Sequence, residues 1–479
     1  MKKIVSIILF IFSVFTFTAC QEKIEAPQDL KLENDILSFS EIDRAKYKAV
    51  FTNTTNNKVS NRVIQNNINI YSLSLEEGEY KLFLEITIGN QVVNTNTITV
   101  VIRDQNAFND FKGETMLDST MIKFIGRTLY DQVDQVNMMY HSGSGFEVKI
   151  VGTSLTADLI GTNTTQQAKK PFLAVIVDGN HDDVRVLSLD EKYNNGLVLA
   201  EGLEYGEHTI RVIKRSEALD SFFGVKGVYT DGKFLDVDHK ERFIEILGDS
   251  TIAGYGNETQ KILINGFPVK DEWGYWKYED KTSGNSNILK TFAYLTAQAV
   301  DADYSIFCAS GWGLTGSIWT NPQTVNLFDA YKKYYATSNN SFVNVYSEED
   351  YNFGAARKAD AVIISVGTND LYYIEAMQGD GIRFQERKQA FIDKYKELVD
   401  FIMYVYGADT QIFMVYGAMV ESRMYTTAEA AYANLSTYSN VHLVKLNGDN
   451  GAVDHHPSVS SNEEMAQVLL AKVKEVMNW

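Results

Sequence analysis

The sequence is poor in cysteine and proline, and it has no cluster of basic residues. Two of its 479 residues are cysteines and five are prolines. Two thiols leave no basis for a disulfide framework. The hydrophobic content of 45% with so few prolines indicates folded domains rather than a disordered chain. No run of Lys and Arg exceeds two residues, and the formal net charge is −18, which argues against nucleic acid or an anionic membrane surface as a partner.

Long hydrophobic runs are also scarce, and the one that stands out is at the N-terminus. Two lysines precede the apolar residues 4–17, and a Thr-Ala-Cys tripeptide ending at Cys20 follows them. This run is too short for a stable membrane span and is typical of a secretory signal. The tripeptide resembles a bacterial lipobox, whose cysteine carries the lipid. We therefore expect residues 1–19 to be a signal peptide and the exported protein to be lipid-anchored through Cys20 to a bacterial membrane, at the outer membrane or cell surface. A plain signal peptide with an incidental cysteine is the alternative.

The length of the chain predicts about three domains, because a single hydrophobic core does not serve 479 residues. Residues 20–28 read as a polar tether. Residues 29–104 contain about seven short runs with alternating or β-branched residues, which predict a small sandwich resembling immunoglobulin or fibronectin type III modules. Residues 105–237 contain eight or nine such runs and predict a jelly-roll-like β-sandwich.

One segment of this second region, residues 206–217 (GEHTIRVIKRSE), gathers several charged side chains. Alternation directs Ile210, Val212 and, one step out of register, Ile213 towards a core, and most of the charges to the other face. The segment therefore predicts a strand with one solvated face rather than a binding site.

From residue 240 onward, strands alternate with helices, which predicts an α/β domain with a parallel sheet flanked by helices over residues 240–479. Helices are expected at 286–300 and 382–406, where apolar residues follow helical spacing. A terminal helix is expected after residue 457, with Ser461 and Glu464 at capping-box spacing.

Four polar turns stand out in this domain, three of them directly after predicted buried strands. They are Gly-Asp-Ser at 248–250, Ser-Gly-Trp-Gly at 310–313, Gly-Thr-Asn-Asp at 367–370 and Asp-His-His-Pro at 454–457. Open α/β sheets place reactive groups at the carboxyl ends of their strands. The four turns therefore predict one shared site.

The residues in these turns fit acyl transfer by a serine, which requires a base, a group that orients the base, and donors for the oxyanion. Ser250 is the candidate nucleophile, His456 the base and Asp454 its orienter. The candidate oxyanion donors are the backbone N–H groups of Ser250 and Gly311 and the side-chain amide of Asn369.

Each turn also has an ordinary structural explanation. Gly-Asp-Ser is a common strand-to-helix turn, Gly311 fits a plain turn, and Asn369 fits an Asx turn. A lone histidine in such a loop is more often a surface residue than a base. It is the occurrence of all four turns in one chain that favours catalysis.

The Gly-x-Ser-x-Gly elbow of α/β-hydrolases is absent from the sequence, which disfavours that version of the site. The four turns instead resemble the sequence blocks of the SGNH, or GDSL-like, hydrolases. That resemblance implies Ser250 as nucleophile, Gly311 and Asn369 as oxyanion donors, and an Asp–His pair as orienter and base. The terminal histidine of that family precedes proline, which favours His456 over its neighbour His455.

The whole of residues 105–479 is similar to carbohydrate esterase family 2, in which a jelly-roll domain precedes an SGNH domain. The upstream matches are residues 122–129, 142–155, 175–179 and 206–217. The resemblance implies deacetylation of plant polysaccharides such as xylan or glucomannan, without a metal or other cofactor. The module at 29–104 lies outside it, and an insertion at 257–285 is expected to reshape the cleft.

The sequence thus predicts an exported, monomeric serine esterase that removes acetyl groups from carbohydrate. Trp312, beside Gly311, is a candidate for stacking on a sugar or for core packing. Two other hypotheses stay open: a surface glycan-binding lipoprotein that keeps the hydrolase fold without turnover, and an SGNH esterase acting on lipid, thioester or other acyl substrates.

Overall fold

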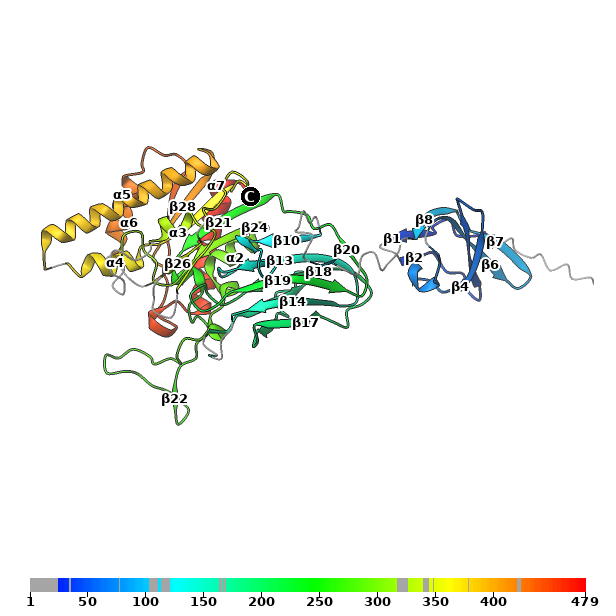
Figure 1. The fold of residues 1–479 in the computed structure, drawn as a ribbon, viewed down its shortest axis with the longest axis horizontal. Coiled ribbons are helices and arrows are strands. Elements are labelled where there is room, and N and C mark those ends of the chain that lie inside the picture. The colour runs from blue at the N-terminus through cyan, green and yellow to red at the C-terminus, as the bar shows by residue number, and fades with distance from the viewer. Residues whose placement is uncertain are drawn as a thin grey trace, which may run out of the picture. The chain divides into compact units, whose positions relative to one another are not determined.

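The computed structural model of the chain is shown in Figure 1. It describes residues 25–33, 36–76, 78–102, 111–112, 121–162, 166, 169–316, 326–338, 344–347, 349–377, 379–419 and 424–479. The expected signal peptide and Cys20 lie outside these residues. The chain divides into two compact units, residues 1–104 and 105–479, which are taken separately below. Within the described part of the chain, no helix has both the length and the apolar character needed to cross a membrane.

In its described residues, the first unit consists of two β-sheets and a 3-10 turn at Ile70–Leu73. One sheet has the order β1 (Lys31–Glu33), β2 (Ile36–Ser38), β5 (Ile68–Asn69). The other has the order β4 (Val59–Ile64), β3 (Lys46–Asn53), β6 (Gly78–Ile88), β7 (Gln91–Asn94), with β8 (Ile98–Ile102) also paired to β6. Along β6, alternate residues are buried, among them Leu82, Leu84 and Ile86. With Leu37 and Phe51 they form one core between the two sheets, as expected for strands with one buried face.

The second unit begins with two antiparallel sheets that enclose a core. One contains β10 (Ile122–Ile125), β13 (Gly145–Gly152), β18 (Gly206–Lys214), β15 (Phe172–Val177), β16 (Arg185–Ser188) and β20 (Lys233–Leu235). The other contains β11 (Thr128–Asp131), β12 (Val136–Met139), β19 (Phe223–Thr230), β14 (Leu155–Gly161), β17 (Tyr193–Ala200) and β9 (Phe111–Lys112). Phe146, Val148 and Val212 of the first sheet meet Leu155 and Ala157 of the second, so the region is a β-sandwich (Figure 1).

The rest of the unit is an α/β domain. Its five-stranded sheet is parallel, in the order β24 (Ala302–Cys308), β21 (Arg242–Gly248), β27 (Ala361–Ser365), β28 (Gln411–Tyr416), β29 (Val441–Lys445). Apolar residues of α2 (Phe292–Ala299) and α7 (Val459–Met477) pack on one face. Those of α3 (Leu327–Tyr331), α4 (Thr368–Glu375), α5 (Gly381–Tyr406) and α6 (Met424–Ala433) belong to the core on the other. The predicted order of β-rich regions followed by an α/β domain is confirmed.

Two helix starts differ from the sequence prediction. The helix expected from residue 286 is preceded by a 3-10 turn at Ile288–Lys290, because Asn287 caps that turn by accepting a hydrogen bond from the N–H of Leu289. The terminal helix starts three residues before the predicted capping box. Its cap is Ser458, whose Oγ accepts from the N–H of Ser461 at 3.2 Å. In the 257–285 insertion, β22 (Leu263–Ile264) and β23 (Phe267–Pro268) form an exposed hairpin (Figure 1).

The β-sandwich and the α/β domain share a hydrophobic core. Ile125, Ile176 and Ile213 of the sandwich belong to the same buried cluster as Ile244 and Ile246 of β21. One face of the β10–β13–β18–β15 sheet is therefore covered by the α/β domain rather than by water.

Because the α/β domain covers this face of the sheet, part of the prediction for residues 206–217 is wrong. Ile210 and Val212 do face the sandwich core, but Lys214, Arg215 and Glu217 are buried as well. The prediction of a solvated face is wrong at this end of the segment. Arg215 lies on the face that alternation assigns to water, but that face meets the α/β domain, where Arg215 pairs with Glu258. Lys214 shares the face of Ile210 and Val212. The buried charges are instead satisfied by ion pairs and hydrogen bonds.

A second buried charge also crosses between the two domains. Arg127, which follows β10, pairs with Glu245 of β21 at 3.2 Å, and both side chains are almost fully buried. Tyr331 and Tyr406 donate to the same carboxylate at 2.5 and 2.6 Å. Glu245 therefore has three donors, which is the kind of satisfaction that a buried carboxylate requires.

Candidate active site

The parallel register brings three of the four polar turns to one edge of the sheet. Gly248 at the end of β21 is level with Cys308 of β24 and with Ser365 of β27. Ser250 and Ser310 each follow their strand position by two residues. The predicted blocks therefore emerge side by side at the carboxyl ends of adjacent strands.

Ser250 is the first residue of a short helix, α1 (Ser250–Ala253). Asp249 caps this helix by accepting from the N–H and the hydroxyl of Thr251 at 2.9 and 2.8 Å. Gly248 is required by close packing, since a Cβ there would lie 2.7 Å from the carbonyl oxygen of Ser365. The turn therefore holds Ser250 rigidly, and Asp249 serves the turn rather than the base.

His456 faces Ser250. Its Nε2 lies 2.8 Å from the Ser250 Oγ, although the two residues are 206 positions apart in the chain. The other ring nitrogen, Nδ1, lies 3.2 Å from the carbonyl oxygen of Val453. A carbonyl can only accept, so Nδ1 carries the proton and Nε2 is left as the acceptor for the serine hydroxyl. This is the arrangement of a nucleophile with its general base.

Asp454 does not take the role that the sequence predicts for it. Its carboxylate accepts from the hydroxyl of Tyr255 at 2.9 Å, and the contact that orients His456 comes from the backbone of Val453. The reason is local geometry: Asp454 and His455 both have left-handed backbone angles, with φ of 52° and 61°. This conformation turns the Asp454 side chain away from the position in which it would reach Nδ1.

His455, the alternative base, is exposed and lies away from the serine. Its ring makes an edge contact with Tyr275 of the insertion, with ring centroids 4.6 Å apart. Of the two adjacent histidines, the structure thus brings only His456 to Ser250.

Tyr255 is a residue of the site that sequence reasoning did not single out. Its ring stacks on His456 with centroids 4.4 Å apart and an angle of 27° between the planes. Its hydroxyl holds Asp454. Tyr255 lies five residues after Ser250, and the glycine before it ends α1 in a left-handed conformation. Gly254 is therefore the sequence signal that could have indicated an early end of the helix and placed Tyr255 near the base.

The expected oxyanion donors lie on the neighbouring turns. Gly311 has a φ of 79°, and a Cβ at this position would meet no atom, so its N–H belongs to a turn with open space beside it. Among the described residues this N–H has no hydrogen-bond acceptor. Asn369, in the first turn of α4, donates from Nδ2 to the carbonyl oxygen of Trp312 at 2.9 Å. That bond links the two donor turns and uses one of the two amide hydrogens of Asn369.

Asp370 holds the loop that follows Gly311 in place. Its carboxylate accepts from the N–H groups of Leu314 and Thr315 and from the Thr315 hydroxyl, at 2.7 to 3.0 Å. Burial raises the pKa of Asp370 to about 6, although these hydrogen bonds oppose the rise. The loop that follows Gly311 is therefore tied to α4 by a buried carboxyl group.

Trp312 is a core residue: of the two roles expected for it, the structure shows core packing and not a side chain exposed to a sugar. Its side chain is 2% exposed and packs on Phe307, with ring centroids 5.4 Å apart, and on the edge of His141. The chain turns at Gly311, so Trp312 points back under the sheet edge instead of into solvent.

The environment of His456 favours the neutral base. Burial lowers its pKa below the ordinary value of 6.5, while the Val453 carbonyl and the carboxylates of Asp454 and Glu217 partly oppose this shift. Since the neutral imidazole is the form that accepts the serine proton, we expect the acid limb of the kcat/KM profile to have its midpoint below pH 6.5. The profile is measured with 4-nitrophenyl acetate from pH 4.5 to 8.5. A midpoint above 6.5 would contradict the assignment.

Replacing Asp454 by asparagine tests whether the Val453 carbonyl or the Asp454 carboxylate orients the His456 ring. Because Nδ1 bonds to Val453, we expect kcat to fall by less than about 10-fold, against the roughly 10⁴-fold loss seen when the orienting carboxylate of a Ser–His–Asp triad is replaced. The acid limb should also move to lower pH, because the Asp454 carboxylate raises the pKa of His456. A loss of 10³-fold or more would restore Asp454 as the orienting residue.

Two hollows of the surface lie away from this site. One hollow of about 670 Å³, for example, is lined by Glu147, Asp178 and Arg211 among others, and neither Ser250 nor His456 borders it. The site is identified by its chemistry rather than by cavity size.

Comparison with known proteins agrees with the fold. The model of the family "Carbohydrate esterase 2 N-terminal" matches residues 124–237. Cellulase/esterase CelE of Acetivibrio thermocellus is 27% identical over 352 residues, which are 71% of this chain and 37% of CelE. The chain thus spans little more than a third of that relative. An acetylxylan esterase / glucomannan deacetylase of Cellvibrio japonicus is 24% identical over 421 residues, which are 86% of this chain and 99% of that protein.

Solved structures share the fold. A family two carbohydrate esterase from Clostridium thermocellum, in complex with cellohexaose, has a TM-score of 0.60 at 24% identity and covers 75% of this chain and 99% of its own. An acetyl xylan esterase from the rumen bacterium Butyrivibrio proteoclasticus has a TM-score of 0.63 at 20% identity, covering 78% and 98%. The chain is therefore similar to the family two carbohydrate esterases: residues 124–237 match that family's N-terminal domain, and three quarters of the chain share the fold of a solved member.

Proposed function

We propose that this protein is a serine esterase that removes O-acetyl groups from plant polysaccharide or oligosaccharide of the xylan or glucomannan type. The observation that carries the proposal is the 2.8 Å contact between Ser250 and a histidine whose Nδ1 is held by a backbone carbonyl. The substrate class is supported by the relatives named as acetylxylan esterase / glucomannan deacetylase.

The mechanism follows from the roles of the residues. Ser250 Oγ attacks the acetyl carbonyl carbon while His456 Nε2 takes the hydroxyl proton, and the negative charge develops on the carbonyl oxygen. The N–H groups of Ser250 and Gly311 and the Asn369 amide are the donors assigned to that oxygen. Collapse of the tetrahedral intermediate breaks the C–O bond to the sugar, which leaves as an alcohol with the proton from His456. Water deprotonated by the same histidine then attacks the acetyl-enzyme and releases acetate.

Acyl specificity tests this proposal directly. We expect the full chain to release acetate from acetylated xylan and glucomannan, and to cleave 4-nitrophenyl acetate faster than the butyrate and octanoate esters. Faster cleavage of the octanoate would favour an esterase for other acyl chains. Binding to the polysaccharides without detectable acetate release would favour the glycan-binding hypothesis.

We further propose that the protein is exported and anchored through a lipid on Cys20, that the module at residues 29–104 is an immunoglobulin-like spacer, and that the enzyme is a monomer. The support is the sequence around Cys20 and the compact all-β unit that follows it. Detergent phase separation tests the anchor, because Cys20→Ser should move the protein from the detergent to the aqueous phase. Equal partition of the two proteins would contradict it.

A further inference from the structure

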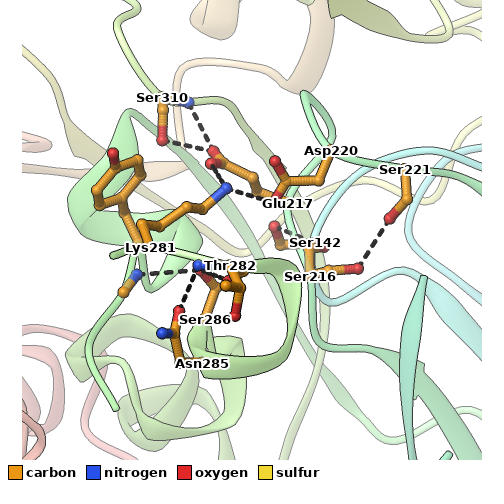
Figure 2. A network of polar contacts seen from close by, with 12 residues as sticks. Ser142, Ser216, Glu217, Asp220, Ser221, Lys281, Thr282, Asn285, Ser286 and Ser310 are labelled. Atoms are coloured by element: carbon orange, nitrogen blue, oxygen red, sulfur yellow. Dashed lines mark hydrogen bonds and ion pairs between the residues drawn. The ribbon is translucent and has the colours of Figure 1, made fainter. Parts of the chain in front are cut away.

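A carboxylate from the β-sandwich reaches the edge of the sheet where the candidate active site lies. Glu217 follows β18 and is 1% exposed. Its Oε2 accepts from the hydroxyl of Ser310 at 2.5 Å and from the N–H of the same residue at 3.2 Å. Figure 2 shows both contacts. Ser310 is the residue directly before Gly311, so both of its polar donors are held by a side chain from another domain.

A buried lysine completes the contact. Lys281 Nζ lies 2.8 Å from the other oxygen of Glu217, and it also pairs with Asp220 (Figure 2). Burial alone would raise the pKa of Glu217, but Lys281 and the hydrogen bonds from Ser310 hold it below the ordinary value. The Glu217 carboxylate that accepts from Ser310 is therefore ionised. Hydrogen bonds to a charged acceptor are stronger than those between neutral groups.

The same lysine lies beside the tyrosine that contacts the base. Its Nζ lies 5.2 Å from the ring centroid of Tyr255, the residue that stacks on His456. The Glu217–Lys281 pair thus contacts both the oxyanion turn and the tyrosine next to the base. Glu217 itself is held in place by its neighbour in β18, since Lys214 Nζ donates to the carbonyl oxygens of Ser216 and Glu217 at 2.6 and 2.9 Å.

We propose that Glu217 is a positioning residue for the oxyanion hole: its carboxylate fixes the Ala309–Ser310 peptide through the Ser310 N–H and the Ser310 side chain through its hydroxyl. It thereby restricts the rotation of the next peptide, whose N–H is the Gly311 donor. The inference rests on the proposed function only in assigning that N–H to the oxyanion. It gives the β-sandwich a part in the reaction besides packing. A displacement of about 1 Å in such a donor is enough to cost on the order of 10²-fold in rate.

The substitutions that test this are Glu217→Gln, which keeps the volume and one acceptor oxygen, and Ser310→Ala, which removes one donor. With 4-nitrophenyl acetate we expect Glu217→Gln to lower kcat by about 10- to 100-fold and Ser310→Ala by about 10-fold, both with KM within about threefold of wild type. Because both act on one contact, the double variant should resemble Glu217→Gln alone rather than show the product of the two losses. Ser310→Thr, which keeps the hydroxyl, should recover most of the Ser310→Ala loss.

Glu147→Gln is the matched control. Glu147 is another buried glutamate of the β-sandwich and pairs with Lys123 at 2.7 Å and with Arg211 at 2.5 Å, but it does not touch Ser310. It controls for loss of a buried ion-paired carboxylate in the same domain. We expect it to lower the thermal midpoint while kcat stays within about twofold of wild type.

A second readout is independent of the natural ester. Ethyl 4-nitrophenyl methylphosphonate phosphonylates an activated serine: the Ser250 Oγ–P bond forms, the bond to 4-nitrophenolate breaks, the proton goes to His456, and the phosphoryl oxygen occupies the oxyanion position. We expect the release of nitrophenolate to slow in Glu217→Gln and Ser310→Ala in the same proportion as kcat, and to be unchanged in Glu147→Gln. Wild-type labelling without acetyl esterase activity would reject the proposed function but keep this inference testable through the variants.

Folded Glu217→Gln and Ser310→Ala proteins that keep kcat and phosphonylation rate within about twofold of wild type would overturn the proposal, as would losses confined to KM. A wild-type protein inert to the phosphonate overturns it together with the proposed function. If Glu217→Gln does not fold, the comparison of Ser310→Ala with Ser310→Thr tests the proposal instead, because removing the one hydroxyl of Ser310 is a small change to the fold.

Discussion

Replacing Ser250 by alanine is expected to lower kcat for acetate release by about 10⁴- to 10⁶-fold, the range found when the nucleophile of a serine hydrolase is removed. The hydroxyl of Ser250 is the one group within hydrogen-bond reach of His456 Nε2 among the described residues. Without it no acetyl-enzyme forms, and the oxyanion donors alone supply the residual rate. Acetate released from acetylated xylan and from 4-nitrophenyl acetate gives the comparison with wild type.

The control is Ser188→Ala. Ser188 lies on the edge strand β16, where its hydroxyl contacts Asp190. It should keep the wild-type rate. If Ser250→Ala released acetate within about 10-fold of wild type, while remaining folded, the serine mechanism would be excluded.

Replacing Arg127 by methionine is expected to lower the free energy of unfolding by about 3–5 kcal/mol, the cost of leaving one partner of a buried ion pair unpaired. Arg127 is the cation for Glu245, and it also donates to the carbonyl oxygens of Tyr331 and Lys333 at 2.6 and 2.7 Å. Its guanidinium lies 4.3 Å from the ring centroid of Phe307 and 3.9 Å from that of Tyr351. Urea unfolding followed by tryptophan fluorescence measures the change.

The double variant Arg127→Met, Glu245→Gln shows how much of the stability loss comes from the unpaired charge and how much from lost packing around Arg127. It removes both charges, so it should be more stable than Arg127→Met alone by at least about 1 kcal/mol, since a neutral amide is cheaper to bury than an unpaired carboxylate. A double variant less stable than the single one would show that packing around Arg127, and not the ion pair, dominates.

The sequence was informative where local pattern and strand-end geometry act together. β-branched apolar runs predicted β21 and β27, and the rule that parallel strands end at one edge predicted that Ser250, Gly311 and Asn369 would come together. His456 was chosen over His455 by the proline that follows it, and the structure places the former against Ser250.

The errors have a common cause, which is backbone geometry that side-chain patterns do not encode. Two successive left-handed residues turn Asp454 towards Tyr255, and a backbone carbonyl takes the place of the expected carboxylate. Any residue type at position 453 carries that carbonyl, so no motif reveals it. Trp312 was ambiguous for a similar reason, because the direction of the turn at Gly311 decides whether its ring is buried.

The charged end of segment 206–217 shows a different limit. Alternation correctly separates the two faces of β18, but it does not say whether a second domain covers the outer face. Ile213 and Arg215, which share the outer face, are buried because the α/β domain packs there, and that partner lies far away in the sequence. Long-range burial of a charged face is invisible to a period-2 pattern.

The shared core of Ile125, Ile176 and Ile213 with β21 has a consequence for how this enzyme can be divided. In many modular enzymes an accessory β-domain can be cut off or exchanged while the catalytic domain remains intact. Here the boundary near residue 240 separates sequence segments but not folding units. Cutting the chain there would expose one continuous apolar surface on each side, and it would leave the buried Glu245 carboxylate without its partner Arg127. The natural point of division is near residue 104 instead, where the chain passes from the first compact unit to the second.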